Sequence, residues 1–160
     1  MPDLRSIHTG KFRVMSRAIF SNKNKIFVIR GRSSTKEERF FVLPGGTVEF
    51  GETSKRTLVR EMREEFSTKL KNIKYLGSIE NLFSWKGKEH HEIAFIYSAS
   101  FASRSFYKRS LIAGIEDTGE KIVGEWRKIS EFKNGKETLV PVGILSLLGG
   151  KSSKEKHYPK

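Results

Sequence analysis

Residues 45–65 read GGTVEFGETSKRTLVREMREE, and this stretch decides how the rest of the chain is interpreted. Its second half has the period of a helix, because apolar side chains recur every fourth residue, at Leu58, Met62 and Phe66. Thr53 or Ser54 stands before this run and can cap the helix N-terminus. The stretch therefore predicts an amphipathic helix with one apolar stripe that faces a core.

Three glutamates share a neighbouring face of this helix. At roughly 100° per residue, Glu64 lies about 60° to one side of Glu61 and Glu65 about 40° to the other. Like charges at this spacing repel one another. Arg60 can neutralise part of the face, whereas a hard divalent cation neutralises more of it, because carboxylate oxygens are the ligands that Mg²⁺ and Mn²⁺ select. The alternative is an acidic face exposed to solvent.

Two adjacent glycines, Gly45 and Gly46, stand before the helix and add a backbone element. Because glycine tolerates positive φ, a carbonyl or amide at this turn can approach a metal or a phosphate closely. Taken together, the glycine turn, Arg60 and the three acids favour a metal or phosphate site over a plain acidic face.

The segments around this unit predict strands and one further helix. Partly alternating or apolar runs favour strands at Phe12–Phe20, Ile26–Ile29, Phe40–Leu43, Ile73–Leu82, Glu92–Phe101 and Ile122–Ile129. We expect turns or loops at Ser21–Lys25, Gly31–Glu38, Pro44–Gly46 and Trp85–Lys88, and a long polar, functional loop at Ser103–Glu120. Pro141 opens a closing helix over Val140–Leu148. This order predicts one α/β domain with a mixed sheet over residues 1–160.

The composition argues against a membrane protein and indicates the sign of a partner's charge, but it does not identify the partner. The chain has 160 residues, no cysteine and a net charge of +13, from 31 lysines and arginines against 18 acids. The apolar runs are shorter than the roughly 18 residues of a membrane span, and no signal peptide is visible, so we expect a cytoplasmic protein with no membrane partner. The basic charge draws anions such as nucleotides or nucleic acid. Residues 151–160 are expected to form a flexible basic tail.

The spacing of the fixed residues resembles the signature of the Nudix hydrolase (MutT-like) family. Gly46 is followed after five residues by Glu52, and after seven more by Arg60–Glu65, which reads REMREE. The match departs from the family pattern at Ser67 and Thr68, where the family has glycine and then an aliphatic residue. Because the left-handed turn after a helix is cheap only for glycine, Ser67 leaves the geometry of the helix exit open, and it removes no ligand. The resemblance implies an α/β/α sandwich with a mixed β-sheet.

The resemblance also implies an activity and a set of site residues. Nudix enzymes hydrolyse the pyrophosphate linkage of a nucleoside diphosphate joined to another moiety, with Mg²⁺ or Mn²⁺ as cofactor. Their pattern assigns catalytic roles to Glu61, Glu64 and Arg60, with Glu61 as a candidate base. The implied metal ligands are the Gly45 carbonyl, Glu61, Glu64, Glu65 and a further acid from the loop before Trp126. For that acid we prefer Glu120 to Glu116, Asp117 and Glu125. Glu52 and Gly46 would support the site.

Arginines and aromatic residues outside the signature are candidates for binding the substrate. Arg17, Arg30 and Arg39 suit phosphate, because a guanidinium group donates two hydrogen bonds at once. Phe83 and Trp85 could stack on a base, although aromatic residues in a hairpin more often belong to the core or its rim. No subgroup marker identifies the substrate, so a nucleoside triphosphate or a similar small nucleotide remains the residual choice.

Two other functions stay open at this point. One is a Nudix-fold module that binds or senses a nucleotide without turnover, which the intact glutamates argue against. The other is an RNA-directed role, either removal of pyrophosphate from RNA 5′ ends or RNA binding, which draws on the net charge of +13. A nucleic-acid partner is thus not favoured, and a homodimer is an expectation taken only from the family.

Overall fold

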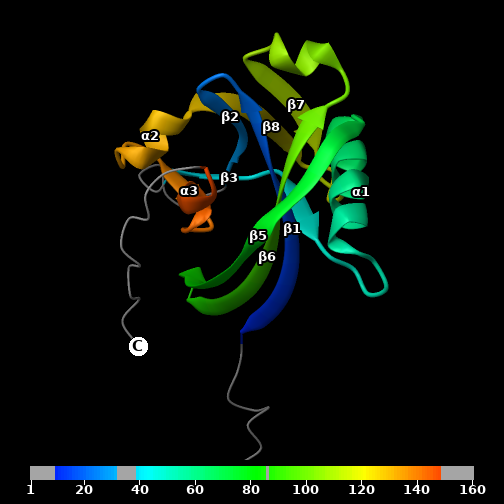
Figure 1. Cartoon of the computed structure of the whole chain (residues 1–160). Helices are drawn as coiled ribbons and strands as arrows, with labels where there is room; N and C mark the ends of the chain where they lie inside the picture. Colours follow the sequence, from blue (N-terminus) through cyan, green and yellow to red (C-terminus); the bar gives the residue numbers. More distant parts are fainter. Residues whose placement is uncertain (1–9, 32–38, 86, 149–160) are drawn as a thin grey trace, which may run out of the picture.

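The computed structural model describes residues 10–31, 39–85 and 87–148, without the side chain of residue 85 (Figure 1). Its elements are β1 (Lys11–Asn22), β2 (Lys25–Arg30), β3 (Phe40–Val42), β4 (Gly45–Thr47), α1 (Ser54–Phe66), β5 (Leu70–Trp85), β6 (Lys88–Phe101), the 3₁₀ helix η2 (Arg104–Tyr107), β7 (Leu111–Ile115), β8 (Lys121–Lys128), α2 (Ile129–Lys133), β9 (Thr138–Val140) and α3 (Ile144–Leu147). The predicted basic tail and most of the predicted loop 31–38 lie outside the described residues. The single domain over residues 1–160 stays a prediction.

The strands form a mixed sheet with helices on both sides. The order is β5-β6-β1-β2-β3-β9, with β4 on β1 and the β7–β8 pair on β2. Pairs β1–β6 and β3–β9 are parallel, and the other strand pairs are antiparallel. Figure 1 shows α1 on one side of the strands and α2 and α3 on the other. The predicted α/β/α sandwich is therefore confirmed.

Two cores fill the two sides of the sheet, and β2 separates them. Phe27 faces the core that contains the apolar stripe of α1, whereas Ile26 and Val28 face the core that contains Phe132 of α2 and Ile144 of α3. This division follows from the alternation of side chains along a strand. Because all four β2 residues from 26 to 29 are buried, the strand reads as a continuous apolar run.

Helix α1 forms as the sequence predicts. The Thr53 side chain accepts a hydrogen bond from the Arg56 backbone N–H at 3.3 Å, which satisfies one of the free donors at the helix N-terminus. Ser67 ends the helix in the left-handed conformation, with φ 50° and ψ 40°, at the position where the family pattern has glycine. A residue with a side chain adopts this conformation at a cost of about 1–2 kcal/mol. The departure from the signature therefore keeps the usual exit geometry.

The turn predicted at Pro44–Gly46 is wrong in part, because Gly45–Thr47 forms strand β4. Gly45 and Gly46 pair with Arg17 and Ser16 of β1 in an antiparallel ladder. A Cβ atom at Gly45, whose φ is +143°, would overlap the Ser16 carbonyl. The glycine is therefore needed for a close approach between two strands. Sequence alone does not separate this role from a turn.

Three further expectations needed correction. The loop predicted at 103–120 contains η2 and β7. Strand β7 was missed because its central Gly114, which packs against α1, has weak strand propensity. The helix predicted at 140–148 shrinks to α3, because residues 138–140 pair in parallel with β3 and Gly143 has φ +128°. The strand predicted at 122–129 ends one residue earlier, where α2 begins. No helix in the described part of the chain is long and apolar enough to cross a bilayer.

Candidate active site

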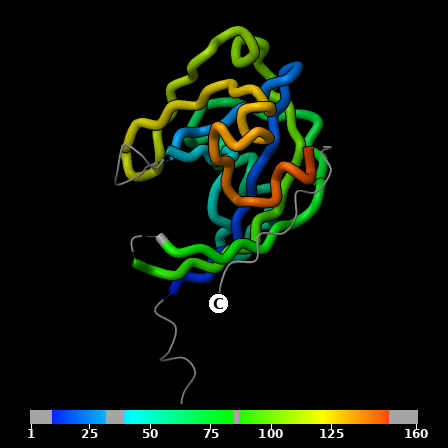
Figure 2. The backbone as a smooth tube through the Cα atoms, turned by 90° about the vertical axis from the view of Figure 1, so that its left-hand side faces the viewer, coloured from blue at the N-terminus to red at the C-terminus, as the bar shows by residue number. Residues whose placement is uncertain are grey.

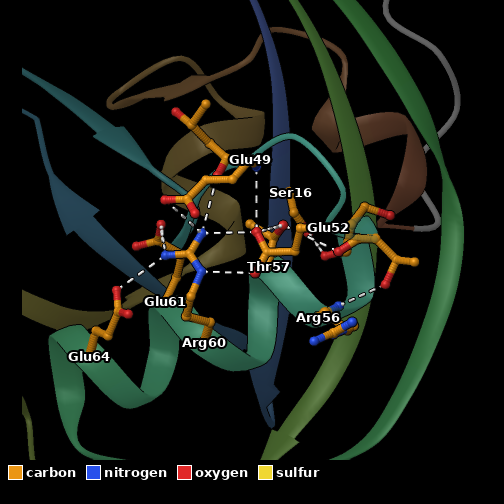
Figure 3. Close-up of polar contacts among 11 residues, drawn as sticks. Ser16, Glu49, Glu52, Arg56, Thr57, Arg60, Glu61 and Glu64 are labelled. Atoms are coloured by element: carbon orange, nitrogen blue, oxygen red, sulfur yellow. Dashed lines mark hydrogen bonds and ion pairs between the residues drawn. The ribbon is translucent and has the colours of Figure 1, made fainter.

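Arg60 is the centre of the polar cluster on α1 (Figure 3). Its Nε and Nη2 atoms donate to the two carboxylate oxygens of Glu52, at 2.8 and 3.0 Å. Its Nη1 atom donates to Glu61 Oε1 at 2.9 Å and to Glu64 Oε2 at 3.1 Å. Nη2 also reaches the Thr47 carbonyl of β4 at 3.3 Å. One guanidinium group thus joins the loop before α1, the helix and strand β4.

Glu52 is fixed in its ionised form by this arrangement. Besides Arg60, the Thr57 hydroxyl donates to Glu52 Oε2 at 2.6 Å. These hydrogen bonds, with that of Arg60 the larger, lower the pKa of Glu52 to about 2. Because two-point pairing of arginine with a carboxylate fixes orientation as well as charge, Glu52 anchors Arg60 rather than serving as a proton acceptor.

Glu61 lies against the glycine strand β4. A Cβ atom at Gly46 would overlap the Glu61 carboxyl group, so only glycine leaves room for this side chain. Burial raises the pKa of Glu61, and nearby Glu64 and Asp117 act in the same direction, while Arg60 opposes them. The glycine of the signature therefore has a direct structural reason: it lets a carboxylate lie over the strand.

Glu65, one turn along the same face, is the most strongly perturbed carboxyl group. Burial, followed by repulsion from Glu61, raises its pKa to about 8, and Glu116 adds to the shift. The Arg17 guanidinium has the opposite effect on Glu65. Crowded carboxylates of this kind favour either a bound proton or a bound cation.

The donor set fits a hard divalent cation. Glu61, Glu64 and Glu65 supply carboxylate oxygens, which Mg²⁺ and Mn²⁺ prefer. Burial first, and repulsion between acids second, raise the pKa values of Glu61 and Glu65, and a bound cation would offset both effects. Among the described residues, no three acidic or histidine side chains already surround one point. Arg60 instead holds oxygens of Glu61 and Glu64. A cation would therefore compete with Arg60 for these two carboxylates.

The connection between β7 and β8 brings further acids toward this face. Glu116 raises the pKa of Glu65, and Asp117 raises that of Glu61, so both act on the cluster through their charge. The Glu120 carbonyl accepts a hydrogen bond from the Glu116 N–H at 2.9 Å, which closes this turn. The role expected for the Glu120 side chain stays a prediction.

The predicted phosphate-binding arginines all have partners within the protein. Arg17 Nη1 donates to the Leu43 carbonyl at 3.0 Å, and burial lowers the pKa of Arg17. Arg30 and Arg39 are more exposed and pair with carboxylates. The distances are 3.4 Å from Arg30 to Glu125 and 2.7 Å from Arg39 to Glu137. Arg17 pairs with Gly45 in the sheet, and its charge lowers the pKa of Glu65. Of the three arginines, it is therefore the one linked to the acidic cluster.

Phe83 stacks on His90 across the β5–β6 hairpin, with ring centroids 4.9 Å apart and planes 9° apart. The Phe83 ring therefore packs within the protein, and its stacking on a base stays a prediction. The Trp85 side chain, the second aromatic candidate, lies outside the described residues. The proposed stacking role of Trp85 therefore stays a prediction.

Sequence reasoning missed the hydroxyl groups that hold the start of α1. Ser16 Oγ on β1 donates to the Ser54 carbonyl at 2.7 Å, and the Ser54 hydroxyl contacts the Tyr97 hydroxyl at 2.6 Å. No sequence signal connects these residues, because only the strand order places β1 and β6 beside the helix. Thr57 had a weak signal, since it lies one helical turn after the cap residue.

The chain belongs to the Nudix family, because a model of the NUDIX domain matches residues 11–144. Members of this family are pyrophosphohydrolases that act on nucleoside diphosphate derivatives, and the chain is an enzyme of this class. The matched range includes both the signature seen in the sequence and the polar cluster around Arg60.

Solved structures show the same fold at low sequence identity. A MutT NUDIX hydrolase from Burkholderia pseudomallei is 21% identical, with a TM-score of 0.62 over 88% of this chain and 99% of that one. A NUDIX hydrolase from Nitrosomonas europaea is 18% identical, with a TM-score of 0.60 over 87% of each chain. A MutT protein from Bacillus halodurans is 18% identical, with a TM-score of 0.57 over 86% of this chain and 80% of that one.

Proposed function

We propose that this enzyme is a Mg²⁺- or Mn²⁺-dependent hydrolase of a small nucleotide, with nucleoside triphosphates as the first substrates to test. The observation that supports this most directly is the crowded carboxylate face of α1, where Glu61 and Glu65 have raised pKa values beside Glu64. A pyrophosphate is a polyanion, so an acidic site of this kind needs cations to bind it.

The metal site uses the residues of the α1 face. Glu61, Glu64, Glu65 and the Gly45 carbonyl would hold the cation, with Glu120 as an additional ligand. A cation held there would polarise a phosphoryl oxygen and lower the pKa of a water molecule. Arg60 and Glu52 keep the helix and strand β4 in register, and Arg60 counters the acidic charge when no metal is bound.

Glu61 is the proposed base. Its partly buried carboxylate has a raised pKa, which makes it a better proton acceptor near neutral pH than an exposed glutamate. It accepts a proton from water while the water oxygen bonds to phosphorus. The bridging P–O bond breaks, and its electron pair leaves with the departing phosphate or pyrophosphate. Glu64 is the second proposed catalytic carboxylate.

Phosphate binding outside the metal site would fall to Arg17, Arg30 and Arg39. Arg30 and Arg39 can turn toward a phosphate because Arg127 also pairs with their partners Glu125 and Glu137, so neither buried carboxylate would lose its only ion pair. Phe83 and Trp85 would contact the base. Arg17, which is buried, would act only on the part of the substrate nearest the metal.

A substrate panel tests this proposal. Nucleoside di- and triphosphates, ADP-ribose, dinucleotides and 5′-triphosphate RNA are incubated with Mg²⁺ and scored for released phosphate or pyrophosphate. We expect turnover of at least one small nucleotide, abolished by Glu64→Gln and unchanged by Glu89→Gln, an exposed acid in the β5–β6 hairpin. Nucleotide binding without turnover would instead favour the sensor module, and turnover of RNA alone would favour the RNA-directed enzyme.

A further inference from the structure

Acidic residues are missing from three long stretches of the chain. Residues 10–31, 66–79 and 93–115 contain neither aspartate nor glutamate. The same stretches contain many lysines and arginines, so the net charge of +13 is distributed unevenly along the sequence. An uneven distribution produces a local field stronger than the net charge alone suggests.

The fold brings parts of these three stretches to one end of the sandwich. Lys71 of β5 pairs with Ser100 of β6, and the Ala102 N–H donates to the Lys69 carbonyl at 2.9 Å. The Asn22 side chain in the β1–β2 turn donates to the carbonyl of Tyr107 in η2 at 3.3 Å. Figures 1 and 2 show the β1–β2 turn and η2 at the same, upper end of the molecule.

We call this region the cationic end and define it by eight side chains: Lys23, Lys25, Lys69, Lys71, Lys74, Arg104, Lys108 and Arg109. All eight are exposed. Within the described residues none of them forms an ion pair, whereas Arg13, Arg30, Arg39, Arg60 and Arg127 all pair with carboxylates. Arg56 and Arg63 on α1 are also exposed without an ion pair in the described part of the chain, so the cationic end differs from the rest of the surface by the number of unpaired cations that it gathers.

A shallow pocket lies within the cationic end. It has a volume of about 270 Å³ and is lined by Asn22, Lys23, Asn24, Lys25 and Tyr107. Its lining offers two ammonium groups and two amides, which are donors that phosphate oxygens accept from. No carboxylate lines it. A phosphate group therefore meets hydrogen-bond donors and positive charge without repulsion.

We propose that the cationic end binds the phosphate backbone of single-stranded nucleic acid, separately from the active site. Polar side chains such as Asn22, Asn24 and Ser103 lie next to these cations in the sequence. Serine and asparagine also donate hydrogen bonds to the phosphate backbone in nucleic-acid-binding proteins. Tyr75 follows Lys74 in β5, and its ring packs against Phe95 and Tyr97 on one side. Since the residue is still 51% exposed, the rest of the ring can stack on a base. Membrane association needs an apolar face besides the attraction to anionic lipids, and among residues 21–25, 67–75 and 98–110 the single exposed large apolar side chain is Tyr75.

Fluorescence anisotropy with labelled single-stranded RNA and DNA tests the proposal over a range of salt concentrations. The test variant carries Lys23→Gln, Lys71→Gln and Lys108→Gln, and the matched control carries Lys11→Gln, Lys88→Gln and Lys133→Gln. Both lose three charges, and thermal melting verifies that both fold. We expect the test variant to bind at least tenfold more weakly than the control, with a salt slope lower by about 2, because each lost contact to a single strand removes about 0.7.

Nucleotide hydrolysis is measured on the same proteins and is expected to be unchanged in both, so this proposal and the proposed enzyme function fail separately. Three results would overturn the nucleic-acid surface. They are no binding by the native protein at low salt, equal loss in the test and control variants, and binding to phosphatidylserine vesicles without binding to RNA or DNA.

Discussion

The acidic face of α1 and the cationic end differ in how their charges are compensated. At the acidic face one guanidinium group, that of Arg60, makes hydrogen bonds to Glu61 and Glu64 and to the nearby Glu52. At the cationic end eight cations have no ion-pair partner within the described residues. Internal compensation fixes side chains in place, which catalysis needs. Uncompensated surface charges attract anions over a long range without fixing the position of any one group. Such attraction suits a polymer of repeating phosphates.

The largest effect is expected from removing charge at the acidic face. Glu64→Gln and Glu65→Gln should each lower kcat by two or more orders of magnitude, because a neutral amide cannot balance the charge of a metal ion. Circular dichroism should show an unchanged fold. Near-normal turnover in either variant would remove that residue from the proposed metal site, and the exposed Glu89→Gln is the control.

A smaller loss is expected from Gly46→Ala. The added methyl group would overlap the Glu61 carboxyl group, so the side chain or strand β4 must move. We expect kcat to fall by roughly tenfold or more, since small displacements in a catalytic site are costly, and stability to fall by about 1–3 kcal/mol from overpacking. Urea unfolding and steady-state kinetics measure the two effects. Unchanged values for both would show that Glu61 does not depend on this glycine.

Loss of the anchor on Arg60 should affect activity through position rather than charge at the metal. Glu52→Gln removes a charge-assisted pair and should lower metal affinity or activity by about 10–100-fold, as for other residues that orient metal ligands. Because the pKa of Glu52 is lowered to about 2, its contribution to stability is present above about pH 4.5 and disappears as the pH falls toward 2. Acid unfolding of native protein and variant should therefore converge at low pH.

The smallest effect concerns the metal-free protein. The pKa of Glu65 rises to about 8 in the folded state, so the folded protein keeps a proton that the unfolded chain loses above about pH 4.5. Stability should therefore decrease as the pH rises from about 4.5 to about 8, and Glu65→Gln should flatten this dependence. Thermal melting without divalent cations measures it. The same slope in native protein and variant would contradict a buried, crowded Glu65.

The sequence predicted the part of the site that lies on one helix and missed the part that depends on strand pairing. Glu61, Glu64 and Glu65 share a face by helical period, so their spacing was sufficient. Gly45 was interpreted as a turn residue, because glycine is common both in turns and at close strand contacts. The contact between Ser54 and Tyr97 spans 43 residues and follows only from the fold.

The cationic end shows the same limit at a larger scale. Its lysines were visible as composition and gave only the sign of a partner's charge. The β1–β2 turn with Lys23 meets the end of η2, which precedes Lys108, because the Asn22 side chain contacts Tyr107. The helix predicted at 140–148 is too long for a related reason. Its first residue, Val140, belongs to β9, which pairs with β3.

The central claim is that the carboxylates of α1 hold a divalent cation, and Mn²⁺ titration followed by electron paramagnetic resonance tests it most directly. The account predicts that the native protein binds Mn²⁺ and that Glu64→Gln and Glu65→Gln weaken this binding at least tenfold, while Glu89→Gln binds normally. Equal Mn²⁺ affinity in all four proteins, or no binding by the native one, would contradict it.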